Sequence, residues 1–285
     1  MSAAELLVVS TRPHARVSTR FLRSELKIIF GRRRNIAGLA VLAVVPVILA
    51  ISVRVSSPSQ GGGPDLIIAI AGNGLFVAFG ALALELPLFL PLAVSAISGD
   101  SIAGEANLGT LRYLLTVPAG RTRLLVIKYT AIVIFALAAT VLVALVGTIM
   151  GLALFGGGDM TTLSGTQIPL ADSVWRLVLS SLYLAAQFSA LGAIGLFIST
   201  LTEQPIGATI AIVLVDVLMF ILDSISQLAW LHPWLLVHWW TAFADLVRDP
   251  IAAESIARGL ITAAVYAGVF WLAAWARLST KDISS

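Results

Sequence analysis

Two carboxylates lie in stretches of this sequence that carry no other charge, which makes them the first candidates for chemistry. Glu85 lies in residues 66–98, and Asp216 lies in residues 204–222. A carboxylate in an apolar environment is costly unless it is protonated, paired or in contact with water. Glu85 therefore indicates a polar site between helices or, because its run is longer than a bilayer requires, a position near the outer boundary. Asp216 is a candidate buried polar contact.

Two histidines invite a metal site. His232 and His238 have Asp223 and Asp245 as their nearest carboxylates, and the sequence contains no cysteine. Pro233 disfavours one continuous helical face that would carry both histidines. We therefore expect these histidines to have a structural role at a membrane interface, and we expect no metal ligands in this chain.

The connection between the second and third apolar runs, residues 99–128, concentrates charge and glycine. Gly99 and Asp100 are expected to end the preceding span, and residues 101–115 predict a short amphipathic helix, ended by Pro118 and Gly120. Its apolar positions are Ile102, Leu108, Leu111 and Leu115, and its polar positions are Glu105 and Arg112. Such a helix either inserts into a groove on a partner or only links two spans.

Motifs of known catalytic chemistry are absent from the sequence. It contains no phosphate-binding loop, no nucleophile elbow, no H-E-x-x-H pair and no cysteine pair. We therefore expect no catalytic residues, no cofactor bound by this chain and no ATP hydrolysis by it alone.

The elements that position these residues are long apolar runs. Of 285 residues, 59% are hydrophobic and 12% charged, against about 25% charged in an average soluble domain. A helix needs about 20 mostly apolar residues to cross a bilayer. Six runs meet this need: 36–53, 66–98, 129–158, 177–202, 204–222 and 259–276. The sequence predicts an all-α, polytopic membrane protein with six transmembrane helices.

A further stretch, residues 224–244, carries no formal charge but differs from the six runs. The segment 224–245 holds both histidines, Pro233 and four tryptophans. Tryptophan favours the headgroup level of a membrane, so we interpret this stretch as an interfacial or re-entrant segment.

Orientation follows from the basic residues. With six spans, fourteen of the eighteen lysines and arginines lie on one side. The positive-inside rule places that side in the cytoplasm, with both termini of a multi-pass protein of the inner (plasma) membrane. The high isoelectric point, near 9.6, is therefore a signal of topology and not of nucleic-acid binding.

The basic amino-terminal segment, residues 1–35, contains a predicted amphipathic helix at 17–34. Its apolar face carries Leu22, Leu26 and Ile29, and Arg23 lies towards another face, as in helices that lie along an anionic membrane surface. Residues 36–276 form the predicted membrane domain, which includes the loop 99–124, and residues 277–285 form a cytoplasmic tail.

The polar loop resembles a family. The family's pattern is G-E, G-T-L, L-L, P, R and K in that order, and the matching residues are Asp100, Gly104–Glu105, Gly109–Thr110–Leu111, Leu114–Leu115, Pro118, Arg121 and Lys128. This pattern is typical of the permease subunits of export-type ABC transporters of the second integral-membrane class, which have six spans per subunit. The resemblance is dense over about 30 residues, and the basic amino-terminal helix and the tryptophan-rich segment are similar to the family's as well.

The resemblance implies a dimer with a second permease subunit, identical or similar, and two separate cytoplasmic ATPase subunits that hold ATP and Mg. It also implies a cytoplasmic coupling helix between the second and third spans and a connecting helix at 17–34. The implied coupling residues are Gly104, Glu105, Gly109, Thr110, Leu111, Arg112 and Leu115, with Leu22, Arg23, Leu26 and Ile29 in the connecting helix. Glu85 and Asp216 are candidates for the translocation path, and the substrate class expected is a drug, a lipid or another amphipathic molecule.

Two other functions stay open from the sequence. A polytopic membrane enzyme could use Glu85, Asp216 or the histidines on a lipid, without an ATPase. A permease-like assembly subunit would have no transport path.

Overall fold

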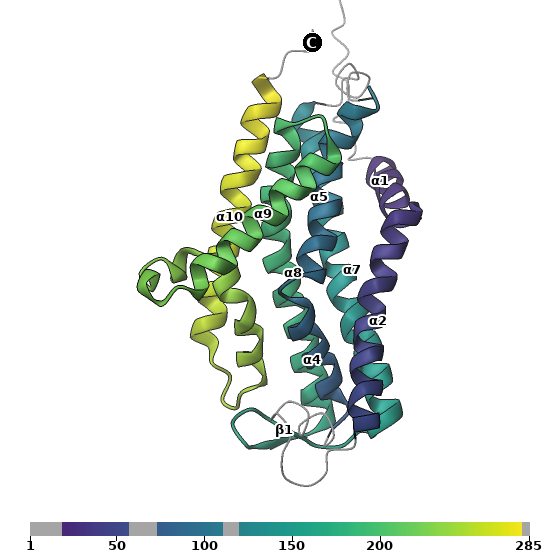
Figure 1. Ribbon diagram of the computed structural model, residues 1–285, viewed down its shortest axis with the longest axis vertical. Coiled ribbons are helices and arrows are strands. Elements are labelled where there is room, and N and C mark those ends of the chain that lie inside the picture. Colours follow the sequence, from purple (N-terminus) through teal and green to yellow (C-terminus); the bar gives the residue numbers. More distant parts are fainter. Residues whose placement is uncertain (1–18, 57–72, 111–119, 281–285) are drawn as a thin grey trace, which may run out of the picture.

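The described residues of the computed structural model, 19–56, 73–110 and 120–280, form a bundle of long α-helices (Figure 1). The α-helices are α1 (Thr19–Gly31), α2 (Arg33–Ser56), α4 (Leu75–Glu85), α5 (Phe89–Asn107), α7 (Arg121–Phe155), α8 (Leu170–Leu201), α9 (Pro205–Ser224) and α10 (Ala253–Thr280). A two-stranded antiparallel hairpin joins α7 to α8. It pairs β1 (Met160–Thr161) with β2 (Gln167–Ile168), so that Met160 lies opposite Ile168.

Five helices are long and apolar enough to cross a membrane, namely α2, α7, α8, α9 and α10. The helices α4 and α5 pass the same test only as a pair, and they are bent by 57° at the break between them. The described part of the chain therefore has five candidate spans, or six if the bent pair is one span. Within the described residues, each of the six predicted apolar runs overlaps one of these helices or the pair.

The break between α4 and α5 lies at Pro87. Glu85 is the last residue of α4, and α5 begins at Phe89. Proline lacks an N–H group and its ring clashes with the preceding helical turn, so it interrupts a helix. Pro91 lies in the first turn of α5, where the N–H groups have no partner within the helix and proline is tolerated.

The core of the bundle is built around α8, against which α5, α7 and α10 pack. By contrast, α2, α9 and α10 keep most of their apolar surface exposed, as helices in contact with lipid do. Small residues let α4 and α7 approach closely. A Cβ atom added at Gly74 would overlap the backbone of Gly151, and one added at Gly147 would overlap Ala78.

The two ends of the bundle differ. The amphipathic helix α1 and the carboxy-terminal end of α10 lie at one end, and the β1–β2 hairpin lies at the other (Figure 1). Arg121, at the start of α7, donates hydrogen bonds to the carbonyl oxygens of Leu278 and Ser279 at the end of α10. We call the end that holds α1 the basic end.

Residues 226–247 form no α-helix and are not among the candidate spans. They form three 3₁₀ segments, Ser226–Leu228, His232–Trp234 and Val237–Val247, and the chain after α9 projects sideways between the two ends of the bundle (Figure 1). Trp230 and Trp234 are exposed, whereas Trp239 and Trp240 are buried. The segment therefore has an apolar outer surface and an anchored inner part.

One sequence-based expectation is wrong. Gly99 and Asp100 do not end the helix, because α5 runs through both residues to Asn107. The predicted separate helix over 101–115 is therefore, up to residue 107, the last part of α5. The physical reason is packing: Gly99 lies directly against Thr209 of α9, where a Cβ atom would overlap it.

Candidate functional site

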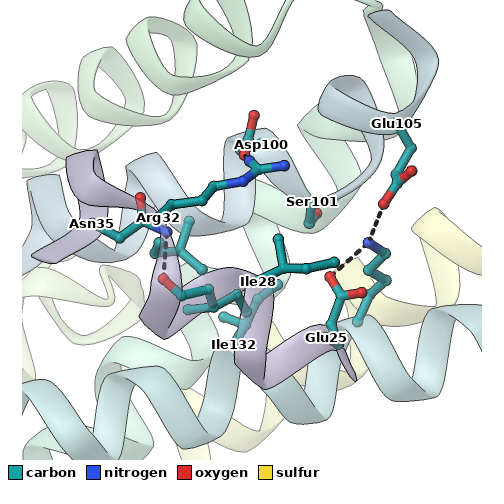
Figure 2. Close-up of a pocket in the computed structure, with 11 residues that line it drawn as sticks. Glu25, Ile28, Arg32, Asn35, Asp100, Ser101, Glu105 and Ile132 are labelled. Atoms are coloured by element: carbon teal, nitrogen blue, oxygen red, sulfur yellow. Dashed lines mark hydrogen bonds and ion pairs between the residues drawn. The ribbon is translucent and has the colours of Figure 1, made fainter. Parts of the chain in front are cut away.

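A buried lysine joins three helices at the basic end. Lys128 of α7 is 3% exposed, and its Nζ lies 2.6 Å from Glu25 Oε1 of α1 and 3.0 Å from Glu105 Oε1 of α5. Figure 2 shows Glu25 and Glu105 extending towards each other across this position. One cation thus pairs with two carboxylates from different helices and ties α1, α5 and α7 together.

A second ion-pair cluster lies beside the first. Asp100 of α5 accepts from Arg32, and its Oδ2 lies 3.1 Å from Nη2 of Arg34. Both arginines lie at the junction of α1 and α2, and Arg32 extends towards Asp100 in Figure 2. Glu25, Arg32, Asp100, Glu105 and Lys128 border a cavity of about 30 Å³, which is room for about one water molecule.

The end of α5 is shaped by its own sequence. Thr110 N–H donates to the carbonyl oxygen of Glu105, and Gly109 N–H donates to that of Ala106. This hydrogen-bond pair is the Schellman motif, which requires a left-handed residue after the helix. Gly109 supplies it with φ +69°. The Thr110 hydroxyl also donates to the Glu105 carboxylate. Glu105 therefore takes part both in the hydrogen bonds that end α5 and in the ion pair with Lys128.

A serine from α8 fixes the same part of α5. Ser199 Oγ accepts hydrogen bonds from the N–H groups of Ile102 and Ala103, at 3.0 and 2.8 Å, and donates to the Gly99 carbonyl oxygen at 2.8 Å. Ser199 is fully buried. The last turns of α5 are thus held by α1, α7 and α8.

The structure brings together part of the predicted coupling motif. Glu105, Thr110 and Lys128 form one bonded group, and Asp100 pairs beside it. Gly104 is buried against Asp100, where a Cβ atom would overlap the carboxylate. Leu111, Arg112 and Leu115 lie outside the described residues.

The sequence reasoning missed Glu25 and Ser199. Glu25 lies beside the apolar residues Leu22, Leu26 and Ile29 on the inward face of α1. Its exposed fraction is 6%. A carboxylate on an apolar helical face is a signal of a buried ion pair, and it could have been read. Arg23 is exposed, as predicted for the polar face.

The two candidate path residues lie on different helices. Glu85 is fully buried at the end of α4, and Asp216 is 3% exposed in α9. Helix α4 packs mainly against α2 and α7, whereas α9 packs mainly against α5. Among the described residues, neither Glu85 oxygen has a hydrogen-bond partner, and Asp216 Oδ1 has none either.

Long apolar helices, an amphipathic helix at one end and an ion-pair network beside it define a helical protein of the integral-membrane class. Residues 68–284 match the model of a family described as protein of unknown function (DUF2705). The chain belongs to this family. No curated protein matches it.

Proposed function

We propose that this protein is the membrane-spanning permease subunit of an ABC exporter, with α4 and α5 as one broken span and six spans in all. Two such subunits, identical or similar, would form the translocation path, and separate cytoplasmic ATPase subunits would bind ATP and Mg. The substrate would be a drug, a lipid or another amphipathic molecule. The resemblance of the 99–128 loop suggests this function.

The observation that carries the proposal is the Glu25–Lys128–Glu105 network. A permease must pass motion from its ATPase to its spans, and that requires a contact element rigidly joined to them. The network joins the end of α5 to α1 and to the long helix α7. A push on this end of α5 would therefore move three helices together.

The tip of α5 is suited to contact a partner. Leu108 is 66% exposed at the end of the helix, next to its Schellman stop, and Asn107, Gly109 and Thr110 are exposed around it. In this proposal Leu108 enters a groove on the ATPase subunit, as the apolar residues of a docking helix do. In this proposal the Glu105 carboxylate does not contact the partner. It holds the end of α5 in position through its contacts with Lys128 and Thr110.

The placement of the ends supports the topology. Helix α1 and the end of α10 lie at the same end of the bundle (Figure 1), as an even number of spans requires. Most lysines and arginines lie in the segments that meet there, and the positive-inside rule places that end in the cytoplasm.

The first experiment is gentle purification of the tagged chain from its own host, followed by identification of the proteins that accompany it. The proposal expects a stoichiometric cytoplasmic protein that carries a phosphate-binding loop. If the chain purifies alone even after mild crosslinking, the proposal is wrong and an enzyme acting on a lipid becomes the better reading.

Variants of the α5 tip then test whether this tip couples the permease to the ATPase. Glu105→Gln removes the charge that faces Lys128 but keeps the shape, and Gly109→Pro removes the φ +69° stop. Both are expected to insert into the membrane as wild type does and to lower substrate-stimulated ATP hydrolysis at least about tenfold, a change of about 1.4 kcal/mol. The matched control is Glu254→Gln, which alters the exposed Glu254–Arg258 pair at the start of α10. Normal stimulated hydrolysis in both variants would contradict this role of the α5 tip.

A further inference from the structure

Three potential metal ligands meet where α9 ends. One ligand atom from each of Asp223, His232 and His238 lies within 4.8 Å of the other two. Asp223 Oδ1 is 2.8 Å from His238 Nδ1 and 3.9 Å from His232 Nδ1. All three side chains are partly exposed on the surface of the described structure.

His232 is oriented as a ligand. Its Nε2 lies 3.1 Å from the carbonyl oxygen of Ile225. A carbonyl can only accept a hydrogen bond, so Nε2 carries the proton, and Nδ1 on the Asp223 side keeps its lone pair. Histidines that bind metals commonly donate their other ring N–H to a backbone carbonyl in this way.

The spacing fits a small tetrahedral ion. Zinc binds histidine nitrogen and carboxylate oxygen at about 2.0–2.2 Å, which places ligand atoms of a tetrahedron about 3.3–3.6 Å apart. The distances of 2.8 and 3.9 Å from Asp223 lie on either side of this range. In the metal-free state, His238 Nδ1–H donates to Asp223. With zinc bound, that proton would reside on Nε2 of the same ring.

The segment that carries the histidines is held in place. Trp239 Nε1–H donates to the carbonyl oxygen of Pro233 at 3.0 Å, and the Tyr266 hydroxyl of α10 donates to that of Trp234 at 2.9 Å. The His238 ring meets the Trp239 ring edge to face, at 5.1 Å between centroids. The ligands are thus positioned before any ion arrives.

We propose that Asp223, His232 and His238 bind a zinc ion, with a fourth position open to water. The ion ties the end of α9 to the tryptophan-rich segment that follows it. This inference is independent of the proposed transport function. It differs from the expectation from the sequence, which was a structural role without a metal. As Pro233 indicated, no continuous helical face carries both histidines, but the chain turns between them and their rings lie 5.7 Å from each other.

The test is a calorimetric titration of zinc chloride into the purified full chain, after dialysis against a chelator and with an affinity tag that contains no histidine. We expect one zinc per chain in the wild type and a Tm that rises with zinc. His232→Gln keeps a donor for the Ile225 carbonyl but removes the imidazole ligand, and Asp223→Asn removes the carboxylate. Each is expected to weaken zinc binding by at least about 100-fold, the upper range for changes to groups that only support a ligand.

The control is His14→Ala, which alters the remaining histidine of the sequence, outside the described residues. It is expected to bind zinc as the wild type does. An unchanged Tm of the variants without zinc shows that they are folded. Absence of stoichiometric binding in the wild type would overturn the proposal, as would equal zinc affinity in the wild type, His232→Gln and Asp223→Asn.

Discussion

Lys128 places a charged ammonium group inside the protein, and this burial is tolerated because two carboxylates pair with it. With 3% exposure it contacts Glu25 and Glu105. Removing one member of a buried ion pair leaves an uncompensated charge and costs about 3–5 kcal/mol. In this site it leaves two carboxylates facing each other, which adds repulsion between like charges.

We therefore expect Lys128→Ala to lower the Tm of the detergent-solubilised protein by several degrees. The comparison is Arg258→Ala, which breaks the exposed Arg258–Glu254 pair and is expected to change the stability by no more than about 0.5 kcal/mol. Equal Tm values for the two variants would show that the Lys128 network does not stabilise the fold.

Among the elements, the crossing of α4 and α7 depends most on residue size. Without a hydrophobic driving force between helices in lipid, small residues let backbones pack closely. Gly147 and Gly151, four residues apart on α7, face Ala78 and Gly74 of the α4 region. The glycines are needed because backbone atoms occupy the space that a Cβ would fill.

Gly151→Ala is expected to destabilise the protein by about 1–3 kcal/mol, the usual cost of overpacking, as measured by Tm in detergent. Gly268→Ala in α10 is the matched control, because nothing lies within 4 Å of its added Cβ, and alanine favours a helix more than glycine does. A Gly151→Ala protein as stable as Gly268→Ala would mean that α4 and α7 can separate at little cost.

For the whole molecule, the number of times the chain crosses the membrane decides whether its two termini lie on the same side. The bent α4–α5 pair crosses once in the six-span arrangement and returns to its starting side in the five-span one. The native sequence has no cysteine, so single cysteines report the side directly. Ser24 of α1, Gln167 of β2 and Ser279 of α10 are exposed positions for them.

In intact cells, we expect a membrane-impermeant maleimide to label Gln167→Cys only. Ser24→Cys and Ser279→Cys are expected to react only after the membrane is opened, because both lie at the basic end. Labelling of Ser24→Cys and Ser279→Cys from opposite sides would establish an odd number of spans and contradict the six-span topology.

The sequence by itself determined the local features. Apolar runs of span length located every long helix, because a helix in lipid needs little beyond length and apolarity. The 3.6-residue period defined the two faces of α1. The break between α4 and α5 lies at Pro87, because proline lacks an N–H group and its ring clashes with the preceding helical turn.

Only the tertiary structure decided which polar groups meet. Lys128 and Glu25 are 103 residues apart, and His238 and Asp223 are 15 apart with a turn between them. Their contacts depend on how helices pack and where the chain turns, which no local pattern encodes. Packing also carried α5 through Gly99 and Asp100, where the sequence suggested a helix end, because α8 supplies Ser199 to the backbone there.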